Sequence, residues 1–321
     1  MTLVDSLLAM GVGVVLLVGG AEALVRGAAA LALRFGITPL VVGLTVVAFG
    51  TSSPELVVSV QAALSGNGPV ALGNVIGSNV ANLGLIVGVS AALSPLAVDR
   101  QLLTRDVPVM IVSMLALWGL AANGTIGLVE GAVLTAGIVA YTWWGISASR
   151  RETKRAHAAA DELPLEVQAA REQPGWRLVL NGVFVVAGLA LLVVGADLLV
   201  GGAVTVAETV GVSQAVIGLT LVAVGTSLPE LATTVVAAFR GHGEIALGGA
   251  IGSNVFNVLG VLGPAAMVRP IPTEGVGAGV YGIMLGMALL TTFFLATGGR
   301  TKRWEGFVLL ACYGVYLWWI V

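Results

Sequence analysis

The segment GLTVVAFGTSSPELVVSV at residues 43–60 returns 175 positions later as GLTLVAVGTSLPELATTV at residues 218–235. The match extends without a gap over residues 36–88 and 211–263, where 28 of 53 positions are identical. Identity peaks at polar residues rather than at apolar ones, and packing alone would not preserve that pattern. The chain is therefore a duplication around a polar motif. The alternative is that the duplication reflects only how the fold grew.

The composition is that of a membrane protein. Of the 321 residues, 57% are apolar and 10% are charged, and the mean hydropathy is +1.00, whereas soluble domains carry about 25% charged residues. A soluble two-domain enzyme is excluded. A single cysteine, Cys312, and only two histidines exclude an intramolecular disulfide and make zinc or haem chemistry improbable, so no cofactor is expected.

Apolar runs long enough to cross a bilayer predict ten transmembrane helices. The residues from Met1 to Gly20 lack the pattern of a secretory signal and are interpreted as the start of the first helix. The predicted ranges are 3–33, 39–64, 69–92, 106–122, 126–147, 177–206, 213–238, 244–268, 275–297 and 302–321.

Equivalent helices of the two copies are five crossings apart, so the second copy is expected to lie upside down in the membrane relative to the first. The predicted fold is an all-α polytopic membrane protein with ten transmembrane helices in two inverted five-helix repeats. The first repeat covers residues 1–149, with its polar part at about 36–92, and the second covers 177–321, with its polar part at about 211–268. Inverted repeats suggest transport by alternating access.

The segment at 150–176 is a charged linker that contains prolines. Thirteen of the 15 Lys and Arg residues fall in the gaps on the linker's side; Arg269 lies on the other side and Arg26 lies within the first apolar run. The positive-inside rule therefore predicts a protein of the cell (inner) membrane with a cytoplasmic linker and both termini outside.

Two carboxylates, Glu55 and Glu230, lie within apolar segments, where an ionised side chain costs at least a few kcal/mol unless it is neutralised. The helices that carry the motifs have no Lys or Arg at that depth, so a bound cation or a proton is the expected partner. On each helix a threonine lies one turn before the glutamate, on the same face, a serine follows the threonine and a proline precedes the glutamate. These residues are Thr51, Ser52 and Pro54 in the first copy and Thr226, Ser227 and Pro229 in the second.

Each proline removes a backbone hydrogen bond, which is expected to open the helix and free nearby carbonyls, such as those of Ala48 and Ala223, to bind an ion. An ordinary proline kink is the structural alternative. The following helices contain GSNVAN and GSNVFN, in which a serine and an asparagine four positions apart share one face. These pairs are Ser78 with Asn82 and Ser253 with Asn257. Asn79 and Asn254 lie off that face and are left outside the site, with contact between helices as their alternative role.

The predicted site thus offers carboxylate, amide, hydroxyl and carbonyl oxygens, which are the ligands of Ca²⁺ and Na⁺. Two carboxylates balance one Ca²⁺, whereas three Na⁺ would leave one positive charge, so an exchange of three for one would move charge across the membrane.

With GTSSPE at Gly50, GTSLPE at Gly225, GSNVAN at Gly77 and GSNVFN at Gly252, the chain resembles the sodium/calcium exchangers of the calcium:cation antiporter superfamily, in the prokaryotic form without a regulatory domain. The resemblance implies ten helices, antiport of Ca²⁺ against Na⁺, direct binding of Ca²⁺ by both glutamates, and sliding of the first and sixth helices across a rigid core. The ion ligands that it implies are the carbonyls of Ala48 and Ala223 and the side chains of Thr51, Ser52, Glu55, Ser78, Asn82, Thr226, Ser227, Glu230, Ser253 and Asn257.

The counter-ion stays open at this stage. Some prokaryotic relatives have Asp at the position of Asn257, which influences the accepted monovalent ion, and exchange of Ca²⁺ or another divalent cation for H⁺ is the alternative. A channel and an intramembrane hydrolase are less favoured, because the repeats lie in one chain and the predicted helices contain no His and no Lys except Lys302 at the first position of the last range. Ca²⁺, Na⁺ and the bilayer are the expected partners, with neither nucleic acid nor an obligatory protein partner.

Three further charged residues lie in the first and sixth predicted helices. Glu22 and Arg26 are four residues apart and are predicted to form a structural ion pair. Asp197 matches Glu22 in the repeat but has no matching arginine, and its function is open.

Overall fold

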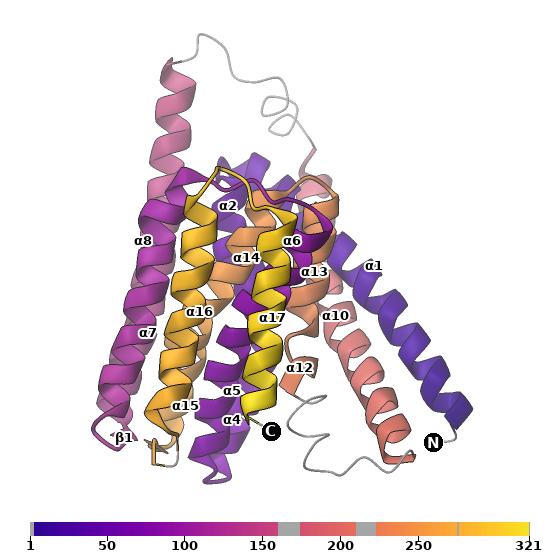
Figure 1. The fold of residues 1–321 in the computed structure, drawn as a ribbon. Coiled ribbons are helices and arrows are strands. Elements are labelled where there is room, and N and C mark those ends of the chain that lie inside the picture. Colours follow the sequence, from indigo (N-terminus) through magenta and orange to yellow (C-terminus); the bar gives the residue numbers. More distant parts are fainter. Residues whose placement is uncertain (1–2, 160–173, 210–222, 275, 321) are drawn as a thin grey trace.

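The structure, a computed structural model, describes the backbone of residues 3–159, 174–209, 223–274 and 276–320, and their side chains apart from residues 155–159 and 223. This part of the chain is almost entirely helical (Figure 1). The N and C marks lie at one end of the bundle, and the end of α8 lies at the other. The helices therefore return the chain to its starting side, as the sequence predicts.

The first half begins with a long helix and continues through helices interrupted by π-helical turns (η). Their bounds are α1 (Leu3–Phe35), α2 (Pro39–Val42), η1 (Gly43–Val47), α3 (Ala48–Thr51), α4 (Ser53–Leu64), α5 (Gly68–Ala81), η2 (Asn82–Ile86), α6 (Val87–Leu93), η3 (Leu102–Asp106), α7 (Val107–Ala121), β1 (Thr125–Ile126) and α8 (Leu128–Ala159).

The second half has a similar order of helices where it is described, but its strand β2 precedes α16, whereas β1 follows α7, and its described residues form no π-helical turn at the place of η3. Its elements are α10 (Gly175–Thr209), α12 (Ala223–Gly225), α13 (Leu228–Phe239), α14 (Gly243–Phe256), η5 (Asn257–Val261), α15 (Leu262–Val268), β2 (Ile271–Pro272), α16 (Ala278–Ala296) and α17 (Arg303–Ile320). Residues 160–173 of the predicted linker and the first ten residues of the predicted helix at 213–238 lie outside the described residues.

Seven helices of the described part are long and apolar enough to cross a membrane, and there are eight if the bent pair Pro39–Thr51 and Ser53–Leu64 counts as one span. α13 is apolar but has only 12 residues. An integral membrane protein is therefore confirmed, whereas the count of ten crossings stays a prediction.

α1 and α10 lie side by side and lean away from the other helices (Figure 1). Glycines allow this contact. A Cβ atom on Gly20 would lie 2.8 Å from the carbonyl oxygen of Gly188, and one on Gly13 would lie 2.7 Å from that of Gly195. Only a residue without a side chain lets the two backbones come so close.

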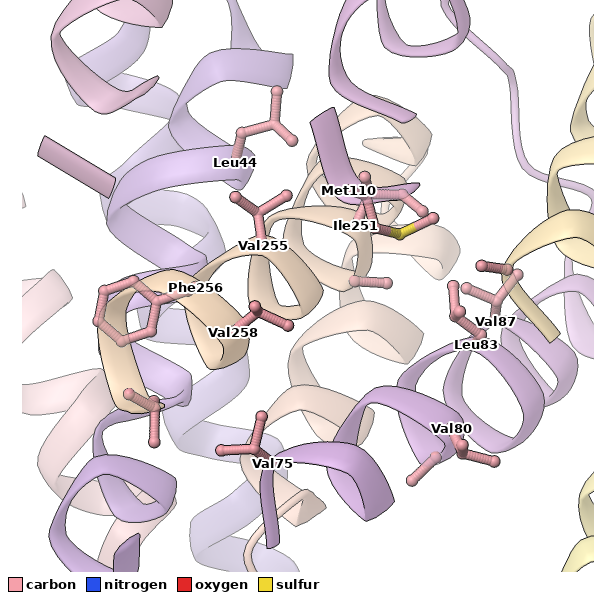
Figure 2. Packing of buried hydrophobic residues seen from close by; sticks show 14 of the residues in the cluster. Leu44, Val75, Val80, Leu83, Val87, Met110, Ile251, Val255, Phe256 and Val258 are labelled. Atoms are coloured by element: carbon pink, nitrogen blue, oxygen red, sulfur yellow. The ribbon is translucent and has the colours of Figure 1, made fainter. Parts of the chain in front are cut away.

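The centre of the bundle is formed by α5 and α14, whose spans are 78% and 94% buried. Figure 2 shows the packing around them, in which Val255 and Ile251 of α14 lie among Leu44 of η1, Met110 of α7 and Val75 of α5. Both helices carry the GSN motifs, so the polar residues of the predicted site are held in the most rigidly packed part of the molecule.

Short backbone pairings at both ends of the bundle follow the same 175-residue offset as the sequence repeat. β1 pairs antiparallel with β2, where Thr125 lies opposite Pro272, and an isolated bridge joins Ala97 to Arg300. At the 175-residue offset Ala97 corresponds to Pro272 and Thr125 corresponds to Arg300. Each of the two pairings is therefore the equivalent of the other in the repeat. The duplication therefore extends beyond the motifs to the connections between helices.

Candidate ion-binding site

The first motif lies at a break between two helices. α3 ends at Thr51, Ser52 leaves the helical region with φ −83° and ψ 8°, and α4 starts at Ser53. The segments before and after the break are bent by 45°. Pro54 occupies one of the first positions of α4, where a missing N–H costs nothing. The single kinked helix predicted over 39–64 is thus two helices, because the proline starts a new helix.

The second motif repeats this geometry. Ser227 has φ −90° and ψ 5°, and it separates α12 from α13, which carries Pro229 in its first turn. The Ser227 N–H donates to the carbonyl of Val224 at 3.1 Å.

The carbonyl of Ala48 is not freed as the sequence predicted. It accepts a hydrogen bond of 3.0 Å from the N–H of Ser52, because the chain keeps one more helical bond before it bends. A carbonyl oxygen has two lone pairs, so one of them is still able to contact an ion. Ala223 is the first described residue of its segment, and its side chain lies outside the description.

Both glutamates lie in the first turn of a helix, Glu55 in α4 and Glu230 in α13. Glu55 is fully buried and Glu230 is 3% exposed. A helix N-terminus carries partial positive charge and so stabilises a carboxylate. Neither glutamate has a Lys or Arg partner within the described residues. A full charge on each would need a further positive partner.

The hydroxyl groups that contact each carboxylate come from the other copy of the repeat. The Ser52 hydroxyl donates to Oε1 of Glu230 at 2.9 Å, and the Ser227 hydroxyl donates to Oε1 of Glu55 at 3.4 Å. Thr226 also contacts Glu55, and Thr51 contacts Glu230. The sequence placed these hydroxyls around the glutamate of their own helix, whereas the two broken helices meet and exchange them. The two carboxylates are close enough for their charges to interact.

Asn82 and Asn257 occupy equivalent places on the two central helices. Each is the first residue of a π-helical turn, η2 or η5, and each is at most 1% exposed. A π-helical turn adds a residue to the helix and is frequent at functional sites. The sequence identified the asparagines, but neither turn is visible in the sequence, because both lie in apolar runs without proline.

Two asparagines outside the predicted set support the site. The Asn79 side-chain oxygen accepts a hydrogen bond of 3.2 Å from the amide of Asn257, which fixes how Asn257 is oriented. Asn74 donates to the main-chain carbonyl of Glu55 at 3.1 Å and to the Ser59 hydroxyl at 2.9 Å. The sequence gave Asn79 no place in the site, and in the structure it positions a predicted ligand.

Oxygen atoms of the predicted set remain without hydrogen bonds. Among the described residues, the buried side-chain atoms without a partner include Oε2 of Glu55 and of Glu230, Oδ1 of Asn82 and of Asn257, and the Ser253 hydroxyl. Buried polar atoms in native proteins are normally paired, so a set of unpaired oxygens from both copies is typical of an ion-binding site. Ser78 is also buried, at 4% exposure. The described residues contain no group of three or more His, Cys, Asp and Glu, so this oxygen set relies on amides and hydroxyls beside its two carboxylates.

Charged residues of the outer helices are arranged differently. Glu22 pairs with Arg26 as predicted, and also with Arg240 of the opposite copy, whose Nη2 lies 2.7 Å from Glu22 Oε1. The Glu130 carboxylate accepts a hydrogen bond of 3.0 Å from the N–H of Gly127 at the start of α8. None of these residues contributes to the oxygen set above.

Buried carboxylates, a hard-oxygen donor set, broken helices and a bundle of long apolar helices are together typical of a membrane protein that binds cations. Comparison with known proteins gives the family. The family described as sodium/calcium exchanger protein matches residues 6–146 and 180–321.

Similar proteins agree with this match. A putative antiporter, CaxA, of Alkalimonas amylolytica is 38% identical over 94% of both chains, and the sodium/calcium exchanger MaX1 of Methanosarcina acetivorans is 34% identical over 95% of both. The solved structure of the sodium-calcium exchanger NCX_Mj, soaked with Na⁺ and Sr²⁺, superposes with a TM-score of 0.83 at 30% identity and 98% coverage of both chains. The chain belongs to the sodium/calcium exchanger family.

Proposed function

We propose that this protein exports Ca²⁺ in exchange for Na⁺ by alternating access, with the ions bound between the two copies of the motif near the middle of the membrane. The observation that carries the proposal is the crossed pairing of Glu55 with Ser227 and of Glu230 with Ser52, which leaves one oxygen of each carboxylate without a hydrogen bond. Two carboxylates in an apolar surrounding need positive charge, and one Ca²⁺ supplies it.

The ligand set that we propose is the one expected from the sequence, with Asn79 added as the residue that orients Asn257. The set is Glu55, Glu230, Asn82, Asn257, Thr51, Thr226, Ser52, Ser227, Ser78, Ser253 and the carbonyls of Ala48 and Ala223. The hydroxyls of Ser52 and Ser227 use their protons on the carboxylates, so their lone pairs remain available to a cation.

We also propose that residues 1–149 and 177–321 are inverted five-helix repeats joined by a cytoplasmic linker at 150–176. Three observations support a two-fold relation between the copies, which inverted repeats require. The hydroxyls are exchanged between the copies, the strand pairings are exchanged by the 175-residue offset, and Gly66 and Gly241, which are 175 positions apart, share a left-handed φ of 77° and 78°.

Na⁺ is favoured over H⁺ as the counter-ion because the unpaired groups of Asn82, Asn257 and Ser253 are oxygen ligands that cannot take up a proton at neutral pH. The name of MaX1 as a sodium/calcium exchanger supports the same counter-ion.

The test is uptake of ⁴⁵Ca²⁺ into proteoliposomes loaded with Na⁺, with K⁺, or with a proton gradient. We expect uptake that needs internal Na⁺ and that is abolished by Glu55→Gln and by Glu230→Gln. Glu130→Gln is the matched control, because its amide oxygen is still able to accept the Gly127 N–H outside the site. Uptake driven equally by H⁺ would establish the alternative counter-ion, and no flux under any gradient would refute the substrate.

A further inference from the structure

A cavity of about 420 Å³ leads from the surface of the bundle to the broken helices. Its lining comes from α4, α10, α12 and α13, and the residues used in the argument are Ser53, Asp197, Thr226 and Pro229. Thr226 contacts Glu55, and Pro229 directly precedes Glu230. The cavity therefore reaches the residues that hold the proposed ion site.

Asp197 is the charged residue in the wall of this cavity. In the sequence of α10 it stands alone between Arg177 and Glu208, in a helix with a mean hydropathy of 2.7 over its most apolar window. Its side chain is exposed, and it forms no ion pair within the described residues. A carboxylate that faced lipid at this depth would cost several kcal/mol, whereas one that faces a water-filled cavity stays hydrated.

The counterpart of Asp197 in the first copy has a different environment. Glu22 is held by Arg26 and, through two contacts of 2.7 and 2.9 Å, by Arg240. The residues at the corresponding positions around Asp197 are Gly201 and Ser65. The second copy thus retains the acid but lacks both basic partners.

The packing differs in the same way. α1 packs directly on α13 beside Glu22, whereas the cavity separates α10 from α4 beside Asp197. Asp197 lies 22 residues from Gly175, which is about 33 Å along the helix at 1.5 Å per residue. α10 runs from the end of the bundle near the linker toward the end that carries the N and C marks (Figure 1), and Asp197 lies in the second half of this helix.

We propose that Asp197 is a cation-recruiting site in the wall of the cavity through which Ca²⁺ and Na⁺ reach Glu55 and Glu230. An unpaired carboxylate in a narrow, low-dielectric cleft raises the local concentration of cations. The inference rests on the function proposed above. It assigns a role to a residue outside the ligand set.

The size of the effect follows from Coulomb's law. One charge about 7 Å from the path of a divalent ion, in water with about 0.1 M salt, changes the local Ca²⁺ concentration about threefold, and that of Na⁺ less than twofold. Asp197→Asn should therefore raise the KM for Ca²⁺ about threefold and leave the maximal rate unchanged. Asp197→Glu should restore the wild-type KM.

The experiment is ⁴⁵Ca²⁺ exchange in proteoliposomes at several ionic strengths set with an impermeant salt. For a stricter test, Asp197→Cys in a Cys312→Ser background is treated with impermeant thiol reagents, one that adds a negative and one that adds a positive charge. The negative reagent should return the KM toward the wild-type value and the positive one should raise it further. Both changes in KM should become smaller at high salt. The Ca²⁺ concentration is varied on the side of the membrane from which the reagents modify the cysteine.

The outcomes separate the two proposals. If the wild-type protein exchanges Ca²⁺ and the Asp197→Asn variant has an unchanged KM at low salt, the proposed role of Asp197 is overturned and the proposed function is not. A cysteine variant that neither reagent modifies would have the same consequence, because its side chain would then not face water. A wild-type protein that moves no Ca²⁺ under any gradient would instead overturn the proposed function.

Discussion

The contact between α1 and α10 provides a stability prediction that can be calculated from the structure. A Cβ atom on Gly20 would lie 2.8 Å from the carbonyl oxygen of Gly188 and 2.9 Å from the N–H nitrogen of Leu192. The two helices would have to part by about 0.6 Å to reach the 3.4 Å at which ordinary contact begins. Overpacking of this kind typically costs about 1–3 kcal/mol.

The adjacent Gly19 is a matched control, because a Cβ atom there would have no neighbour among the described residues within 4 Å. Both Gly→Ala changes gain the same helix propensity of about 0.5–1 kcal/mol, so their difference isolates the cost of the clash. The partner change Gly188→Ala should cost as much as Gly20→Ala, with Gly182→Ala as its control.

The measurement is the apparent Tm of the detergent-solubilised protein followed by tryptophan fluorescence. At about 2 °C per kcal/mol for a chain of this size, Gly20→Ala should melt about 2–6 °C below Gly19→Ala. Equal melting temperatures would show that the two helices do not touch at Gly20, and the description of the α1–α10 contact would be wrong.

Three other predictions concern the site and its orientation. Ser52→Ala should weaken Ca²⁺ binding about tenfold or more, because it removes a hydrogen bond to a carboxylate that is worth roughly 1.5–3 kcal/mol. In a double-mutant cycle measured by calorimetric titration, Ser52→Ala should couple to a substitution of Glu230, which Ser52 contacts in the other copy. Additive effects of the two substitutions would contradict the crossed contact. Asn67 and His242 are exposed and lie at equivalent positions 175 residues apart. In a Cys312→Ser background, the variants Asn67→Cys and His242→Cys should react with an impermeant thiol reagent from opposite sides of the membrane. Reaction of both variants from the same side would exclude inverted repeats. Exchange of three Na⁺ for one Ca²⁺ moves one net charge, so a potential imposed with valinomycin and K⁺ should change the rate of Ca²⁺ uptake, whereas a rate independent of voltage would indicate a neutral exchange.

The sequence predicts the fold well where a helix is long and apolar. The ends of α1, α5 to α6 and α14 to α15 lie within a few residues of the predicted ranges, because hydropathy changes sharply at their polar boundaries. It predicts the interruptions less well. Proline and glycine indicated a disturbance near Pro54, but the position of the break at Ser52 depends on how α4 packs against α5, which is a tertiary effect.

The same division holds for the site. The repeat of polar residues was sufficient to identify Glu55, Glu230 and the asparagines as candidates. A charged or amide side chain within an apolar segment costs free energy unless it has a partner, so its presence indicates a functional role. The origin of the hydroxyls that contact each carboxylate could not be obtained in this way. Helix periodicity places Thr51 beside Glu55 on one face, and only the meeting of two broken helices brings Ser52 to Glu230.

The crossed contacts also explain why the copies have stayed alike at some positions and diverged at others. Ser52 and Ser227 each donate a hydrogen bond to the carboxylate of the opposite copy, so a change in one motif alters a contact of the other. Glu22 and Asp197 are equivalent in sequence, but within the described residues the ion pair of Glu22 with Arg240 of the opposite copy has no reciprocal ion pair at Asp197. They were free to diverge, one into an ion pair with Arg240 beside closely packed helices and the other into an unpaired acid beside a cavity. In a carrier with inverted repeats, the same ion site is reached from both sides of the membrane, so the two copies need equivalent residues at that site. The residues along the two access paths serve different solutions and are able to differ between the copies.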